Sequence, residues 1–189
     1  IPKDAILQME IQKKSMDARK KPQLYYVYCV YCNVKNEDKI LRKKHSSDIS
    51  KVEKTEYTFT ITGDKACEYR PVIIGMGPAG LFCGYMLAQQ GYKPILIERG
   101  KNVDSRTEDV KRFWETGKLN PQSNVQFGEG GAGTFSDGKL NTLIKDKDGR
   151  NRKVLEVFVE HGAPEKILYD GKPHIGTDIL TNVVKSMRK

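Results

Sequence analysis

The first part of the chain carries the hydrophobic pattern of β-strands. Residues 23–34 are β-branched and aromatic without an interrupting glycine or proline, which predicts a strand, and the weakly alternating residues 7–14 are its expected partner. Residues 56–62 alternate cleanly with a period of two, which predicts a further, half-buried strand. Residues 36–44 place two apolar positions among charges and predict a short helix. These elements predict a small α+β module over residues 1–68.

The hydrophobic pattern changes after this module. Residues 72–74 and 95–97 are short, continuous apolar runs, which are typical of strands buried on both faces of a parallel sheet. An apolar stripe over residues 78–90 predicts a helix between them, and Gly91 stands where a helix-ending glycine belongs. Strand, helix and strand in so short a stretch predict a βαβ unit.

Further helices are predicted downstream. A capping-box pattern at residues 105–108 opens a helix that Gly117 closes. A turn at residues 146–149 predicts a β-hairpin, and helices are expected at about 152–162 and 178–188. The predicted fold class is therefore α/β, with an incomplete Rossmann-like FAD/NAD(P)-binding domain over residues 69–189 following the α+β module.

Composition narrows the class of protein. Of 189 residues, 38% are hydrophobic and 30% are charged, which is typical of a globular chain. The chain has no apolar run long enough to cross a bilayer, so we expect no membrane partner. It begins without Met and without a signal peptide, and we interpret it as a piece of a longer, cytoplasmic polypeptide.

The net charge points to anionic partners. Lys and Arg number 33 against 24 Asp and Glu, a formal charge of +9. The densest basic patch consists of Lys13, Lys14, Arg19, Lys20 and Lys21. It could bind phosphate or RNA, but a solvated strand end and turn is the favoured interpretation, because no aromatic or motif context makes the patch specific.

A G-x-G-x-x-G fingerprint follows the first buried strand and opens the helix after it. Its residues are Gly75, Met76, Gly77, Pro78, Ala79 and Gly80. Gly75 would permit the tight turn, Gly77 would let a pyrophosphate approach, and Gly80 would let the helix pack close to the sheet. Glu98, at the end of the next strand, could accept hydrogen bonds from ribose hydroxyls and would repel the 2′-phosphate of NADP.

A second glycine-rich segment, residues 128–139, favours FAD over NAD alone. Its candidate cofactor-binding residues are Gly130, Gly131, Ala132, Gly133, Thr134, Ser136, Asp137, Gly138 and Lys139. Such a long, bare backbone could wrap a large flat ligand and offer many N–H donors. The alternative is a surface loop without a ligand.

The chain resembles the uncharacterised FAD-dependent dehydrogenases of the two-dinucleotide-binding-domain flavoprotein class. The resemblance covers nearly the whole chain, and it is carried by residues 14–20, 70–81, 97–100, 123–140 and 172–178. It implies a FAD domain of the glutathione-reductase class in which the position of Glu98 binds the adenosine ribose, and Arg99 beside it is counted with that site. It also implies that residues 128–140 approach the pyrophosphate and the flavin ring.

Other candidate residues are less specific. His174 could donate a proton near the flavin or substrate, and Lys139 could neutralise pyrophosphate or a reduced flavin. Cys29 and Cys32 form a C-x-x-C, but on a strand they point to opposite faces, so we expect no metal site.

We therefore expect the FAD-binding portion of a flavin-dependent oxidoreductase. It would transfer hydride through flavin N5 to or from an unknown small-molecule substrate, with NAD(P)H as a possible co-substrate. The alternatives are a flavin-binding, RNA-modifying or RNA-associated protein that uses the basic N-terminal module, and a simple NAD-binding domain. A nucleic-acid partner is not favoured.

Overall fold

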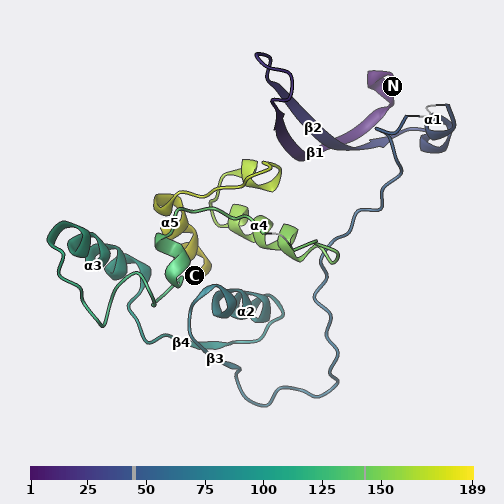
Figure 1. The fold of residues 1–189 in the computed structure, drawn as a ribbon. Helices are drawn as coiled ribbons and strands as arrows, with labels where there is room; N and C mark the ends of the chain where they lie inside the picture. The colour runs from purple at the N-terminus through teal and green to yellow at the C-terminus, as the bar shows by residue number, and fades with distance from the viewer. Residues whose placement is uncertain (44–45, 143) are drawn as a thin grey trace.

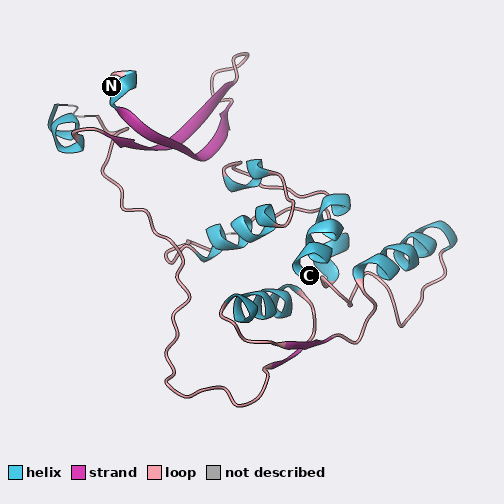
Figure 2. Cartoon of the chain, turned by 180° about the vertical axis from the view of Figure 1, so that it is seen from behind, coloured by secondary structure: helices cyan, strands magenta, loops and turns pink. Residues whose placement is uncertain are grey.

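The computed structural model describes residues 1–43, 46–142 and 144–189, and within them the fold is mixed α/β. Five α-helices, two two-stranded sheets and short 3-10 turns make up the regular structure of these described residues (Figure 2). The predicted α/β class is thus confirmed. The division of the chain after residue 68 stays a prediction.

The N-terminal module is built on an antiparallel hairpin. A 3-10 turn at Lys3–Ala5 leads into β1 (Ile6–Asp17), which pairs with β2 (Tyr25–Val34), so both predicted strands are confirmed. The predicted short helix is α1 (Glu37–Lys43), and the last residue predicted for it lies outside the described residues. A long extended segment then leads away from the hairpin to β3 (Figure 1).

The strand predicted at residues 56–62 is wrong. This segment is extended but unpaired, and Ile61 is exposed. A period-two pattern becomes a strand only when a neighbouring segment supplies hydrogen-bond partners for its backbone, and no described segment does so here. The backbone of Tyr57 instead lies close to Gly149.

The βαβ unit is confirmed. Strands β3 (Val72–Ile74) and β4 (Ile95–Ile97) pair in parallel, with helix α2 (Pro78–Gln89) between them along the chain. Gly91 follows the helix with a φ of +83°, and its N–H bonds to the carbonyl of Ala88, as expected for a helix-ending glycine.

The expectation that this sheet is buried on both faces is wrong. Ile73 and Leu96 lie on the face that α2 covers, where the Leu96 side chain reaches Gly84. Val72 and Ile74 point to the other face and are 56% and 78% exposed. A continuous apolar run is buried on both faces only when both faces have a covering layer, and no described element covers the second face.

Two predicted local features are also corrected. Helix α3 (Val103–Thr116) begins earlier than the capping box suggested, because the side chain of Asn102 accepts the N–H of Ser105. Its end at Gly117 is confirmed. The hairpin at residues 146–149 is wrong: Gly149 opens helix α4 (Arg150–Glu160), and the Asp146 carboxylate accepts the N–H of Arg152. These turn residues therefore start a helix.

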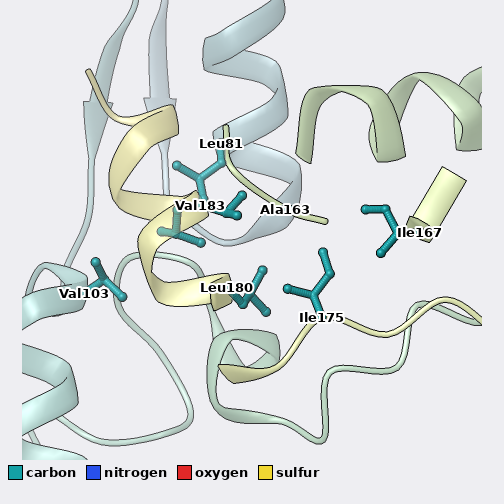
Figure 3. Close-up of a cluster of buried hydrophobic side chains, with 8 residues drawn as sticks. Leu81, Val103, Ala163, Ile167, Ile175, Leu180 and Val183 are labelled. Atoms are coloured by element: carbon teal, nitrogen blue, oxygen red, sulfur yellow. The ribbon is translucent and has the colours of Figure 1, made fainter. Parts of the chain in front are cut away.

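The core lies where α2, α3 and the C-terminal segments meet. The last predicted helix is confirmed as α5 (Thr177–Met187), and Gly176 directly precedes it. A 3-10 turn at Glu165–Leu168 also contributes. Figure 3 shows the buried side chains, which are Leu81, Val103, Ala163, Ile167, Ile175, Leu180, Val183 and Val184. Phe82 of α2 meets Phe158 of α4 edge-on, at 5.5 Å between ring centroids.

Two glycines of α2 give a matched test of this packing. An alanine at position 80 would collide with the carbonyl oxygen of Gly75, whereas one at position 84 would meet only the flexible end of Leu96. Both substitutions gain the same helix propensity. We therefore expect Gly80→Ala to lower the free energy of unfolding by about 1–3 kcal/mol and Gly84→Ala to change it by less than about 1 kcal/mol in urea titrations. Equal effects would contradict this account.

Candidate dinucleotide-binding site

The three fingerprint glycines are present for different reasons. Gly75 has a φ of +96°, in the left-handed region that favours glycine, which agrees with the predicted tight turn. Gly80 leaves no room for a side chain against the carbonyl of Gly75, which confirms its predicted packing role. Gly77 has an ordinary φ of −69°, and a Cβ there would meet no atom within 4 Å. Nothing within the described chain requires glycine at position 77.

Glu98 lies beside this turn and holds its backbone in place through hydrogen bonds. One carboxylate oxygen accepts the N–H of Met76 at 2.6 Å, and the other accepts the N–H of Gly100 at 2.8 Å. The side chain is half-buried at the end of β4. Each oxygen keeps a further lone pair, so the carboxylate can hold the turn and still accept a hydroxyl.

The structure brings the second glycine-rich segment onto the first. The N–H of Gly130 donates to the carbonyl of Met76 at 2.7 Å. A Cβ on Gly131 would press against Pro78 at 3.1 Å and against Gly77 at 3.3 Å. Two segments that are fifty residues apart in sequence therefore form one surface at the N-terminus of α2, where unpaired N–H groups favour anions.

Most glycines of the second segment have a reason within the chain. Gly128, Gly130, Gly131 and Gly138 all have positive φ values and close neighbours. Gly133 does not: its φ is outside the left-handed region, and a Cβ would meet nothing within 4 Å. Within this segment, Gly133 agrees best with the expectation of a backbone left open for a ligand. Gly77 in the fingerprint turn has the same open space beside it.

A buried arginine that the sequence did not single out holds this surface together. The guanidinium of Arg106, on α3, is 0% exposed and donates to four backbone carbonyls. The acceptors are the carbonyl oxygens of Asn124, Val125, Glu129 and Gly131. Burial lowers the pKa of Arg106, and the nearby carboxylates of Glu98 and Glu129 oppose that shift. No motif predicts this role, because it depends on residues far along the chain.

The carboxylate of Glu129 links the second glycine-rich segment to the start of α3 and to the end of α5. This buried carboxylate accepts the N–H of Val103 at 2.6 Å and the guanidinium of Arg188 at 3.0 Å. The other carboxylate oxygen of Glu129 and the hydroxyl of Thr134 are buried and have no partner among the described residues. Thr134 lies against Gly130, within the segment and away from its exposed surface.

The far end of the glycine-rich segment meets His174. Lys139 and His174 are bridged as in an antiparallel ladder, and the N–H of Ile175 donates to the carbonyl of Gly138 at 2.9 Å. The ammonium of Lys139 pairs with Asp137 at 2.8 Å, which lowers the pKa of that carboxyl. The predicted candidates 137, 139 and 174 are therefore neighbours on an exposed rim.

The remaining predicted residues lie on the surface of the same region. The exposed residues among them are Pro78, Ala79, Ala132, Gly133 and Ser136. The guanidinium of Arg99 stacks on the ring of Phe127 at 4.3 Å, so that side chain supports the segment leading into the glycine-rich loop. In the part of the chain that the structure describes, no hydrogen bond or ion pair joins His174 to the fingerprint turn.

All four cysteines are free, and Cys29 and Cys32 lie in β2 as expected. Within residues 1–43, 46–142 and 144–189, no three His, Cys, Asp or Glu side chains gather as metal ligands would. None of the helices that the structure describes combines the length and the apolar character needed to cross a membrane.

Comparison with known proteins gives a relative but no family. No family model matches the chain. An uncharacterized protein of Clostridium beijerinckii is 48% identical over 187 residues, which are 99% of this chain and 35% of the relative. The chain therefore spans about a third of the length of that relative, and the similarity extends over both the hairpin and the glycine-rich segments.

The role of Arg106 can be tested against an exposed arginine of the same helix. Arg106→Met leaves four carbonyls without their donor, so we expect a loss of about 3 kcal/mol in the free energy of unfolding. Hydrogen exchange should accelerate over residues 124–131. Arg112→Met, at a side chain 66% exposed, should change the stability by less than about 1 kcal/mol. Unchanged exchange in Arg106→Met would contradict the assigned role.

The acid stability of this region depends on Asp109. Its carboxylate is buried on α3, and the hydrogen bond from Lys101, at 2.7 Å, holds its pKa below the usual value of 3.8. A carboxyl group whose pKa is lower in the folded state than in the unfolded chain stabilises the fold at pH values above the unfolded pKa. This contribution is lost as the pH falls below 3.8. Asp109→Asn should therefore flatten the decline of Tm between about pH 5 and 2. Glu108→Gln, at an exposed neighbour, should leave that decline unchanged.

Proposed function

We propose that residues 69–189 are the FAD-binding portion of a flavin-dependent oxidoreductase with a Rossmann-like domain. The parallel β3–α2–β4 unit, with a glycine turn at the N-terminus of α2, supports a dinucleotide-binding arrangement. The second glycine-rich segment beside that turn supports a ligand larger than an ADP moiety.

The observation that carries the proposal is the bare backbone at Gly77. Its φ is ordinary and the space beside it is open, so neither conformation nor internal packing explains the glycine. A ligand that approaches the backbone closely does explain it, because a pyrophosphate at a helix N-terminus leaves no room for a Cβ. Gly133, on the neighbouring segment, has the same unexplained freedom.

The chain's own residues would bind and orient the cofactor. When bound, flavin supplies hydride transfer through its N5 atom. The N–H groups that begin α2 would hold the phosphates, and the Glu98 carboxylate would accept ribose hydroxyls while disfavouring a 2′-phosphate. The rim of Lys139 and His174, at the far end of the second glycine-rich segment, would offer a cation and an imidazole ring.

Flavin binding is the direct test. Quenching of FAD fluorescence on titration with the protein should give saturable binding, and we expect Gly77→Ala to weaken it at least about tenfold, which corresponds to about 1.4 kcal/mol. Gly77→Ser should do the same while keeping a favourable helix-start residue, so that loss of binding is separated from loss of the helix.

Gly63 provides the matched control. It also has open space around it, but it lies in the extended segment before β3. Gly63→Ala should leave the affinity for FAD unchanged. Absence of FAD uptake by the full-length protein and a colourless preparation would overturn the proposal, and binding of NAD in preference to FAD would favour a simple NAD-binding domain.

A further inference from the structure

The β1–β2 hairpin displays aromatic side chains that the proposed cofactor site does not use. Tyr26 and Tyr28 are 59% and 49% exposed, and being two residues apart on one strand they share a face, about 7 Å from each other. Across the hairpin, Met16 stands opposite Tyr26 and Lys14 opposite Tyr28. The ammonium of Lys14 lies 4.6 Å from the centroid of the Tyr26 ring.

Positive charge surrounds this tyrosine face. Arg19, Lys20 and Lys21 are exposed in the connection between the two strands, at the same end of the hairpin, and Lys13, next to Lys14 on β1, is exposed on the opposite face. The one acidic side chain among residues 13–21 is Asp17, and Arg19 neutralises it at 2.7 Å. The sequence alone favoured a solvated turn because it showed no aromatic context. The strand register supplies that context, since it sets tyrosines beside lysines.

The face is held in position by contacts on its edge and its back. The backbone N–H of Lys14 donates to the carbonyl of Tyr169 at 2.7 Å, and its carbonyl accepts the N–H of Gly171 at 2.9 Å. On the opposite face, Glu10 pairs with Arg152 at 2.9 Å and with Lys54 at 3.3 Å. The rest of the chain therefore engages the edge of the hairpin and the part of its back around Glu10, while Tyr26 and Tyr28 stay exposed.

We propose that the tyrosine face, defined by Lys14, Met16, Tyr26 and Tyr28, binds single-stranded nucleic acid. Unpaired bases stack on aromatic rings whatever their sequence, and neighbouring lysines neutralise the phosphates. A duplex keeps its base faces covered, and an acidic polypeptide has few flat rings, so neither matches aromatic planes interleaved with cations as well. This surface is independent of the cofactor site.

Affinity measurements with the full chain test the proposal. The probes are labelled oligouridylate and oligothymidylate of about twelve nucleotides, followed by fluorescence anisotropy. Tyr26→Ala and Tyr28→Ala should each weaken binding about tenfold, whereas Tyr69→Ala, at a tyrosine 78% exposed outside the hairpin, should have no effect. Tighter binding of the ribose form would identify RNA, and equal binding would identify single strands in general.

The salt dependence tests the charges separately. Neutralising two phosphate contacts in Lys20→Gln/Lys21→Gln should reduce the slope of log K against log salt by about 1.4. Lys111→Gln/Lys118→Gln, on the exposed part of α3 and just beyond it, should leave the slope unchanged.

A tryptophan variant keeps the test independent of folding. Tyr26→Trp preserves a stacking ring, and its emission should be quenched by the oligonucleotides, while Tyr69→Trp should not respond. Binding that survives both tyrosine-to-alanine changes would overturn the proposal. So would no detectable binding, or tighter binding of heparin, of anionic phospholipid vesicles or of polyglutamate than of either oligonucleotide.

Discussion

The buried guanidinium of Arg106 is the interaction on which the candidate site depends. A charge taken out of water is costly unless hydrogen bonds and opposite charges replace its hydration. Four backbone carbonyls and the carboxylates of Glu98 and Glu129 provide that replacement. Because the carbonyls belong to residues 124–131, the hydrogen bonds of the Arg106 side chain fix the backbone path of the whole segment. The glycine-rich loop reaches the N-terminus of α2 as a consequence.

The glycines show how one residue type serves several purposes. Gly75 is needed for a left-handed turn and Gly80 for close packing of a helix on a strand. Gly128 makes room for the side chain of Arg106. Among the glycines of the fingerprint and of the second glycine-rich segment, Gly77 and Gly133 remain without such a reason, and the proposed cofactor site rests on this observation. A count of glycines in the sequence could not have separated these groups.

Both small sheets show what a strand needs beyond its own pattern. The β1–β2 hairpin forms where two suitable segments are close along the chain, and the parallel β3–β4 pair forms around α2. Residues 56–62 have an equally clear alternation but no described partner, and they remain unpaired. The exposed apolar face of β3 and β4 has the same origin, because the burial of a strand depends on the layer that covers it as much as on the strand's own sequence.

The sequence by itself determined the local elements and the fingerprint. Helices α2, α4 and α5, the paired strands and the βαβ unit follow from periodicity and from helix-ending glycines, which act over a few residues. Only the tertiary structure decided which segments meet. It placed Gly130 against Met76, buried Arg106 among distant carbonyls and set tyrosines beside lysines on the hairpin. The physical reason is that these features depend on desolvation and hydrogen-bond partners far apart along the chain, which no local pattern encodes.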